Sequence, residues 1–236
     1  MKKYLELTLN GKVMRGYENI IDKNKCMVMF HGFTGNKTET NRMFYNIDKL
    51  LETQKFSSLR FDWYGHGESD FDLSQITVGL LLKQAKYILE YANKKYKEVY
   101  LLGFSMGGAL AINSLQTKPK KLILISPAIN MLEKVNSYYN NNEKINECIV
   151  DFHGLKLSKK FVKSFEKLEF ENNLRNFNQP ILLIHGTKDI SVPISNSNLL
   201  YTKFKKGKFV KIKGADHGYS KVEYMNKINQ LILNFI

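Results

Sequence analysis

The stretch Leu101-Leu-Gly-Phe-Ser-Met-Gly-Gly-Ala109 decides the fold. A short apolar run ends in Gly-x-Ser-x-Gly and continues into small residues that suit a helix. This pattern is typical of a nucleophile elbow, a tight strand-to-helix turn whose glycines let a strained serine be presented to solvent. It predicts Ser105 as a nucleophile and Gly103 and Gly107 as the structural glycines of the turn.

Outside this stretch the chain alternates short apolar runs with longer helical patterns. The apolar runs end in polar or small residues and predict parallel strands covered on both faces. They lie at 26–30, 57–62, 99–103, 122–126, 181–185 and 209–212. Apolar residues at three- and four-residue spacing predict helices over 38–53, 75–96, 106–116, 193–204 and 219–235. The predicted fold class is α/β, with a mostly parallel central sheet and helices on both faces.

Two departures from this alternation are expected. Leucines alternate with polar residues ahead of Asn10-Gly11, which predicts an N-terminal antiparallel hairpin of residues 5–9 and 12–17. Residues 127–179 contain no strand of similar quality, so they are interpreted as an inserted lid, and the core becomes 1–126 and 180–236. Within the insertion, Ser158 is expected to cap a helix that places Phe161, Phe165 and Leu168 on one face.

Composition excludes several classes of protein. With 43% apolar residues over 236 positions, the chain can build a sizeable core and is not a disordered tail. The net charge of +14 comes almost entirely from lysine, and nucleic-acid sites favour arginine, so no nucleic-acid partner is expected. Cys26 and Cys148 show no disulfide or metal-ligand spacing, and no apolar run is long enough for a membrane span. A reduced, cytoplasmic location is expected, and a homodimer stays open.

A serine hydroxyl needs a base to take its proton and an acid to orient that base. Such groups follow the last two predicted strands. Asp189 lies in the Gly186-Thr-Lys-Asp loop, and His217 lies in the Gly214-Ala-Asp-His loop. The expected catalytic residues are therefore Ser105, Asp189 and His217, in this chain order.

Other histidines and acids compete for these roles. His31 and His185 each precede a glycine at a strand end and His66 lies in a glycine-rich loop, so loop hydrogen bonding is their expected role, while His153 is expected on the surface of the insertion. Asp216 is the alternative acid, but consecutive loop residues rarely point at each other, so Asp189 is preferred. The Asp62 segment is interpreted as a structural turn.

The developing oxyanion needs hydrogen-bond donors. The segment His31-Gly-Phe-Thr-Gly35 follows a predicted strand at the place where one donor is expected. The backbone N–H groups of Phe33 and Met106 are therefore the predicted oxyanion hole.

These segments also carry a family resemblance. Together with Asp62-Trp-Tyr-Gly-His-Gly-Glu-Ser69, they make the chain similar to α/β-hydrolases over essentially its whole length, including the order Ser, acid, His. The run His31-Gly-Phe-Thr-Gly-Asn-Lys37 and the insertion most resemble bacterial cinnamoyl and feruloyl esterases, with monoacylglycerol lipases and serine aminopeptidase-like hydrolases as neighbours. The resemblance implies an α/β-hydrolase fold in which residues 127–179 cover the site and help to shape the acyl pocket.

The expected function is hydrolysis of small to medium carboxylic esters, including hydroxycinnamate esters, through an acyl-enzyme and without a metal or organic cofactor. The same machinery also serves monoacylglycerol lipases, thioesterases and peptidases, because it fixes acyl transfer but not the leaving group. A hydrolase fold that only binds a ligand is a further alternative, against which the intact Ser105, Asp189 and His217 argue.

Overall fold

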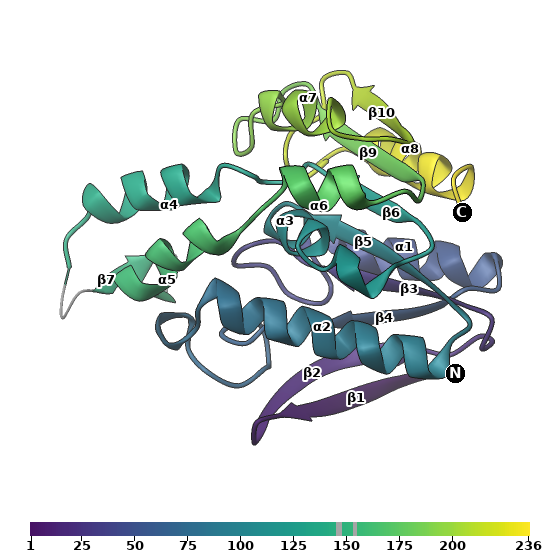
Figure 1. Ribbon diagram of the computed structural model, residues 1–236, viewed down its shortest axis with the longest axis horizontal. Helices are drawn as coiled ribbons and strands as arrows, with labels where there is room; N and C mark the ends of the chain where they lie inside the picture. The colour runs from purple at the N-terminus through teal and green to yellow at the C-terminus, as the bar shows by residue number, and fades with distance from the viewer. Residues whose placement is uncertain (145–147, 153–154) are drawn as a thin grey trace.

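An eight-stranded sheet forms the centre of the molecule (Figure 1). The structure is a computed structural model that describes residues 1–144, 148–152 and 155–236. The strand order is β1-β2-β4-β3-β5-β6-β9-β10. In chain order the strands are β1 (Lys2–Leu9), β2 (Lys12–Asn19), β3 (Lys25–Phe30), β4 (Ser57–Phe61), β5 (Glu98–Phe104), β6 (Leu122–Ile125), β9 (Ile181–Gly186) and β10 (Gly207–Ile212).

The first two strands form the predicted hairpin. Leu9 pairs with Lys12, which leaves Asn10 and Gly11 as a two-residue loop, and both have the positive φ angles that a tight hairpin turn requires. Strand β2 continues antiparallel to β4, and every later pairing in the sheet is parallel. The mostly parallel sheet with an N-terminal antiparallel hairpin is confirmed.

Helices cover both faces of the sheet, and each helix packs its apolar side chains against the sheet. Side chains of α2 (Val78–Lys95), α3 (Met106–Ile112) and α7 (Ser195–Tyr201) pack on one face. Those of α1 (Met43–Thr53) and α8 (Val222–Leu233) pack on the other. Strand β6 is buried at all four residues, which is the burial expected of a strand covered from both sides.

One predicted helix begins later than its sequence pattern indicates. The pattern favours a helix from Thr38, but α1 begins at Met43, after a short 3₁₀ turn at Thr40–Arg42. Glu39, Asn41 and Arg42 all have positive φ angles, which a helix cannot accommodate. This loop turns Glu39 inward, so that its carboxylate is buried and accepts a hydrogen bond from the Gly32 N–H.

The described residues of 127–179 lie beside the sheet (Figure 1). They contain α4 (Met131–Asn140), the antiparallel pair β7 (Cys148–Phe152) and β8 (Leu155–Ser158), α5 (Lys159–Ser164), a 3₁₀ turn (Phe165–Lys167) and α6 (Glu171–Asn176). In Figure 1, α4, β7 and α5 lie at the left, and α6 lies nearer the middle, in front of α3. The small β7–β8 pair is not joined to the main sheet. Ser158 caps α5 as predicted, since its Oγ accepts a hydrogen bond from the Phe161 N–H.

The phenylalanines of this insertion connect it to the core. Phe161 and Phe165 are buried, with their ring centroids 5.0 Å apart, and the Phe161 ring lies 5.7 Å from that of Phe33. Phe33 belongs to the loop after β3, so these contacts bring the insertion against the carboxyl ends of the strands.

Candidate active site

Three loops at the carboxyl ends of parallel strands bring the predicted residues together. Ser105 follows β5, Asp189 follows β9 and His217 lies beyond the end of β10. Ligand sites of open α/β sheets lie outside this edge, which explains why residues so distant in sequence meet here.

The turn at Ser105 is strained and tightly packed. Ser105 has φ 52° and ψ −120°, a conformation that a non-glycine residue rarely adopts. Its N–H donates to the Ile125 carbonyl, and its own carbonyl accepts from the N–H groups of Gly108 and Ala128. These bonds to β6 and the following loop hold the serine in place.

The two flanking glycines are required by close contacts. A Cβ at Gly107 would lie 2.0 Å from the Phe30 carbonyl oxygen, and one at Gly103 would lie 2.4 Å from the Gly107 oxygen. Neither glycine has a positive φ angle, so the backbone strain is confined to Ser105. Their lack of a side chain lets α3 begin directly against the end of β3.

The three side chains form one hydrogen-bonded chain. His217 Nε2 lies 3.1 Å from Ser105 Oγ, and His217 Nδ1 lies 2.7 Å from Asp189 Oδ2. A carboxylate can only accept, so Nδ1 carries the proton and Nε2 is left to accept from the serine hydroxyl. The Phe104 ring packs against the imidazole, with centroids 4.9 Å apart, and helps to hold its plane.

Asp189 is held in its charged form. Burial alone would raise its pKa, but hydrogen bonds from His185 and His217 and from the Val192 N–H hold the pKa of this carboxyl well below its usual value. The alternative acid, Asp216, accepts from the Ser220 N–H. The structure thus pairs His217 with Asp189, as the sequence predicts.

His185 has a second contact beyond its predicted loop hydrogen bonds. Its Nε2 lies 2.9 Å from the Val192 carbonyl oxygen and 3.3 Å from Asp189 Oδ2, while Nδ1 lies 2.6 Å from Ser197 Oγ. Since both neighbours of Nε2 are acceptors, Nε2 carries the proton. The contact with Asp189 was missed from sequence, where a His-Gly pair at a strand end indicates only a turn.

The loop after β3 lies directly beside Ser105. A Cβ at Gly32 would lie 3.2 Å from Ser105 Cβ, and Phe33 lines two cavities that border the serine. Met106 begins α3, and the first N–H groups of a helix have no partner inside it. The two predicted oxyanion donors are therefore on segments that border the serine.

Glu39 holds the loop after β3 in place, a role that the sequence did not predict. Its Oε2 accepts from the Gly32 N–H at 2.7 Å, and its Oε1 accepts from the Thr40 N–H at 2.9 Å. Burial raises the pKa of this carboxyl above its usual value. In the sequence Glu39 resembles any acid in a polar loop, and only its burial distinguishes it.

His31 and His66 join loops beneath the site, in agreement with their predicted role. His31 Nε2 accepts from the Trp63 N–H, and its Nδ1 lies 2.8 Å from the Gly32 carbonyl oxygen. His66 Nδ1 lies 3.0 Å from the Tyr64 carbonyl oxygen, and the two rings are 5.3 Å apart. His153 lies outside the described residues.

Asp62 has the predicted structural role. It is fully buried, accepts from the Glu68 N–H and forms an ion pair with Lys37 at 2.7 Å. These bonds close the turn that follows β4. They occupy the Asp62 carboxylate, which therefore does not serve Ser105.

Two cavities meet at Ser105 and His217. The α4 cavity has a volume of about 280 Å³ and lies under Met131, Lys134, Val135 and Tyr138 of α4. The Glu39 cavity, about 630 Å³ and more open, is lined by residues 32–36, Glu39, Ile190 and Asp216 among others. Phe33, Thr34 and Ser191 also border both, so the two cavities adjoin each other at the serine.

Comparison with known proteins agrees with this geometry. The sequence family described as alpha/beta hydrolase fold matches residues 25–147. The chain belongs to this family. The α/β-hydrolase is 24% identical over 200 residues to the lysophosphatidylserine lipase ABHD12 of Mus musculus, covering 81% of this chain and 48% of that protein. It is also 24% identical over 229 residues to a Mycoplasma genitalium protein named as an esterase/lipase, with 83% of each chain covered.

A solved structure with the same fold covers nearly the whole chain. Est1E from Butyrivibrio proteoclasticus, with ferulic acid bound, superposes with a TM-score of 0.86 at 24% identity, covering 98% of this chain and 97% of that one. The α/β-hydrolase spans about half the length of its ABHD12 relatives. The family match and the superposition show that the chain has the α/β-hydrolase fold.

The described residues contain neither a cluster of metal-ligand side chains nor a membrane-spanning helix. Across residues 1–144, 148–152 and 155–236, no three His, Cys, Asp or Glu side chains gather as metal ligands would. In that same part of the chain, no helix combines the length and apolar composition that crossing a bilayer requires.

Replacing Gly107 by alanine should destabilise the α/β-hydrolase by about 3 kcal/mol or more, because the new methyl group would overlap the Phe30 carbonyl. Gly79 provides a matched control. It lies in α2, and the nearest atoms to an added Cβ are 3.9 Å away, so Gly79→Ala should stabilise by about 0.5–1 kcal/mol. Urea denaturation of both variants measures the difference, and equal stabilities would contradict the close approach of α3 to β3.

Acid should destabilise the fold through the buried histidines. Burial lowers the pKa of His66 to about 4. Burial and the neighbouring His66 ring also hold the pKa of His31 well below its usual value. The unfolded chain takes up protons on these rings near pH 6.5 while the folded chain does not. The free energy of unfolding should therefore fall by up to about 1.4 kcal/mol per pH unit for each ring between about pH 6.5 and pH 4. Glu39 opposes this trend, because its raised pKa makes the fold take up a proton before the unfolded chain does.

The variant His66→Asn tests this window. Asparagine keeps a donor for the Tyr64 carbonyl but has no group that titrates. Its free energy of unfolding should depend less steeply on pH than that of the unaltered protein between about pH 6.5 and pH 5, measured by urea denaturation. Identical slopes would mean that His66 is as readily protonated in the fold as in the unfolded chain.

Proposed function

We propose that this α/β-hydrolase cleaves carboxylic esters through an acyl-enzyme. Ser105 is the nucleophile, His217 the general base and acid, and Asp189 the residue that orients the imidazole. The observation that carries the proposal is the continuous hydrogen-bonded chain from Ser105 Oγ through His217 to a buried, ionised Asp189.

The chemistry proceeds in two steps of the same kind. Ser105 Oγ attacks the ester carbonyl while His217 Nε2 takes its proton, and the N–H groups of Phe33 and Met106 donate to the oxyanion. The tetrahedral intermediate then collapses, and His217 gives the proton to the leaving alkoxide, which departs as the alcohol. A water molecule attacks the acyl-enzyme with the same proton transfers in the same order, which releases the acid and restores the serine.

Residues 127–179 are proposed to act as a lid on a core of residues 1–126 and 180–236. Helix α4 supplies one wall of the α4 cavity, and Phe161 contacts Phe33 beside the proposed oxyanion hole. A lid in this position would limit the acyl or alcohol group that can reach Ser105.

Small to medium esters, including hydroxycinnamate esters, are the proposed substrates. A cavity of about 150 Å³ can hold benzene, so the α4 cavity of about 280 Å³ can hold a substituted ring or a short chain. The likeness to Est1E with bound ferulic acid supports an aromatic acyl group. Lipid esters are the second candidate, favoured by the relatives named as lysophosphatidylserine lipases.

Replacing Ser105 by alanine should lower kcat for p-nitrophenyl butyrate by about 10⁴-fold or more, because no other nucleophile lies at the turn. The unfolding midpoint should change little, and a fluorophosphonate probe should label the unaltered protein and not the variant. A panel of feruloyl, glyceryl, thioester and aminoacyl anilide substrates then ranks the alternatives by kcat/KM. Retention of activity by the variant would contradict the proposal. A ranking led by the anilides would mean that the protein is a peptidase and not an esterase.

Replacing Glu39 by glutamine should lower kcat about tenfold with little change in KM. Two N–H groups each donate to a separate carboxylate oxygen of Glu39, and an amide offers only one acceptor oxygen, so the loop that presents Phe33 loses a bond. Steady-state kinetics on p-nitrophenyl butyrate checks this. Glu52→Gln is the control, because Glu52 also accepts hydrogen bonds but lies on α1 outside both cavities. Equal kcat values in the two variants would contradict a positioning role for Glu39.

A further inference from the structure

The two cavities at Ser105 carry opposite charges. Among their described lining residues, the α4 cavity has one charged side chain other than His217, the cation Lys134. The Glu39 cavity has two, the carboxyl groups of Glu39 and Asp216. An ester bound across the serine would therefore meet positive charge on one side and acidic groups on the other.

Lys134 belongs to the face of α4 that forms the cavity wall. The wall is formed by Met131 and by the residues three, four and seven positions after it, which share one side of the helix. These are Lys134, Val135 and Tyr138. Ala128 and Val192 also line the cavity, while Lys134 itself is exposed to solvent at its mouth. Solvent therefore partly screens the attraction between this ammonium and an anion in the cavity.

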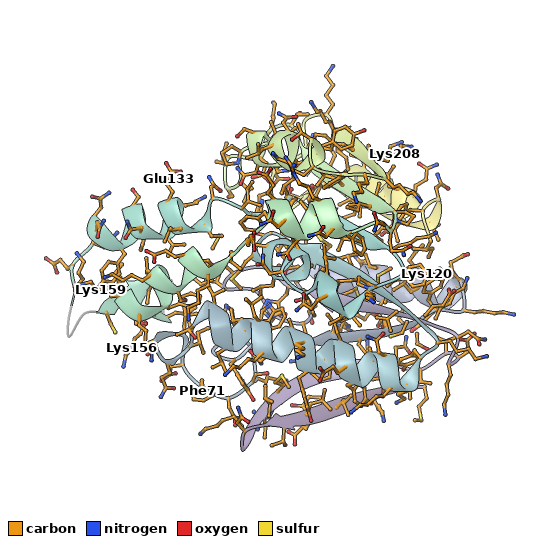
Figure 2. All side chains as sticks on the ribbon, viewed as in Figure 1. Phe71, Lys120, Glu133, Lys156, Lys159 and Lys208 are labelled. Atoms are coloured by element: carbon orange, nitrogen blue, oxygen red, sulfur yellow. The ribbon has the colours of Figure 1, made fainter. Side chains whose placement is uncertain are left out.

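The Lys134 ammonium has a carbonyl partner. Its Nζ donates to the Ser191 carbonyl oxygen, in the loop that also carries Asp189. Within the described part of the chain, no carboxylate forms an ion pair with it. Glu133, the adjacent acid, lies on the outer side of α4, away from α5 (Figure 2). An ammonium with three donors and one neutral acceptor can still bind an anion.

Asp189 does not supply that anion. Its side chain is fully buried and bonded to His217, His185 and the Val192 N–H. The Ser191 carbonyl therefore keeps Lys134 at the wall of the cavity that His217 also lines, without an ion pair to Asp189.

We propose that Lys134 selects esters that carry a carboxylate on the half of the substrate that occupies the α4 cavity. The other half, beside Glu39 and Asp216, is neutral or cationic, since a second anion there would face acidic groups. The proposal rests on the function proposed above and adds the charge of the substrate, which neither the fold nor the nucleophile determines.

The test compares paired esters that differ in charge. If the acyl group enters the α4 cavity, p-nitrophenyl hydrogen adipate should be preferred over p-nitrophenyl hexanoate. If the alcohol enters it, 4-butyryloxybenzoate should be preferred over 4-butyryloxybenzamide. Selectivity is the ratio of kcat/KM for the charged ester to that for the neutral one, and we expect it to exceed one in one of the two pairs.

In that pair, Lys134→Met should lower the ratio about fivefold to tenfold, the effect of one partly screened ion pair. Lys134→Arg should keep the ratio within about twofold, because the charge remains. Lys144→Met is the matched control, since Lys144 also lies in the insertion and donates to a backbone carbonyl, that of Asn140, but lines neither cavity. It should leave the ratio unchanged. Added salt should reduce the ratio of the unaltered protein and not that of Lys134→Met.

Each other outcome has a definite meaning. If Lys134→Met lowers both members of a pair equally, Lys134 only fastens α4 to the Ser191 loop, and the proposal is overturned. If the neutral esters are hydrolysed but the ratio is at or below one in both pairs, the proposal is also overturned. The proposed function would then still stand. Failure of the unaltered protein to hydrolyse any of the four esters would overturn both.

Discussion

The site depends on how closely the backbone at the start of α3 approaches the end of β3. Gly107 lies so near the Phe30 carbonyl that no side chain fits between them, and Gly103 meets the Gly107 backbone in the same way. This contact forces the chain to reverse at Ser105, which takes up the strained φ angle. The strain is maintained by bonds to β6 and to the loop after it, so the sheet itself presents the hydroxyl to His217.

Buried polar groups then fix the partners of the serine. Asp189 is surrounded by three donors, and the resulting low pKa keeps it an acceptor for His217 Nδ1. His31, His66 and Glu39 bind the loops beneath and beside the serine, each through backbone groups that would otherwise be buried without a partner. The site is therefore held by the backbone of four loops, and its reactive side chains need no movement to make contact.

The insertion adds one wall to the site. Its phenylalanines attach it to the loop of Phe33, and α4 turns a mostly apolar face with one lysine toward the serine. The core positions Ser105, His217 and Asp189, while α4 and the Glu39 loop supply the shape and charge of the two cavities. Variation in these two segments would change the cavities without altering the elbow.

Local pattern was sufficient for most of the fold. The glycines around Ser105, the Asn10-Gly11 turn and the apolar runs of the strands act through neighbouring residues, so the sequence alone indicated the elbow, the hairpin and the parallel sheet. The start of α1 was wrong by five residues, because helical spacing does not reveal the positive φ angles at Glu39, Asn41 and Arg42. The order of Ser105, Asp189 and His217 could be predicted because each follows its own strand and the ends of parallel strands meet at one edge.

The sequence by itself determined which residues could react, since a nucleophile, a base and an acid in strand-end loops are a property of local pattern. Only the tertiary structure decided that Asp189 and not Asp216 contacts His217, that Glu39 holds the Gly32 N–H, and that Lys134 faces the cavity. These outcomes depend on distances between atoms far apart in the chain and on which groups lose their water. No spacing along the sequence encodes either quantity.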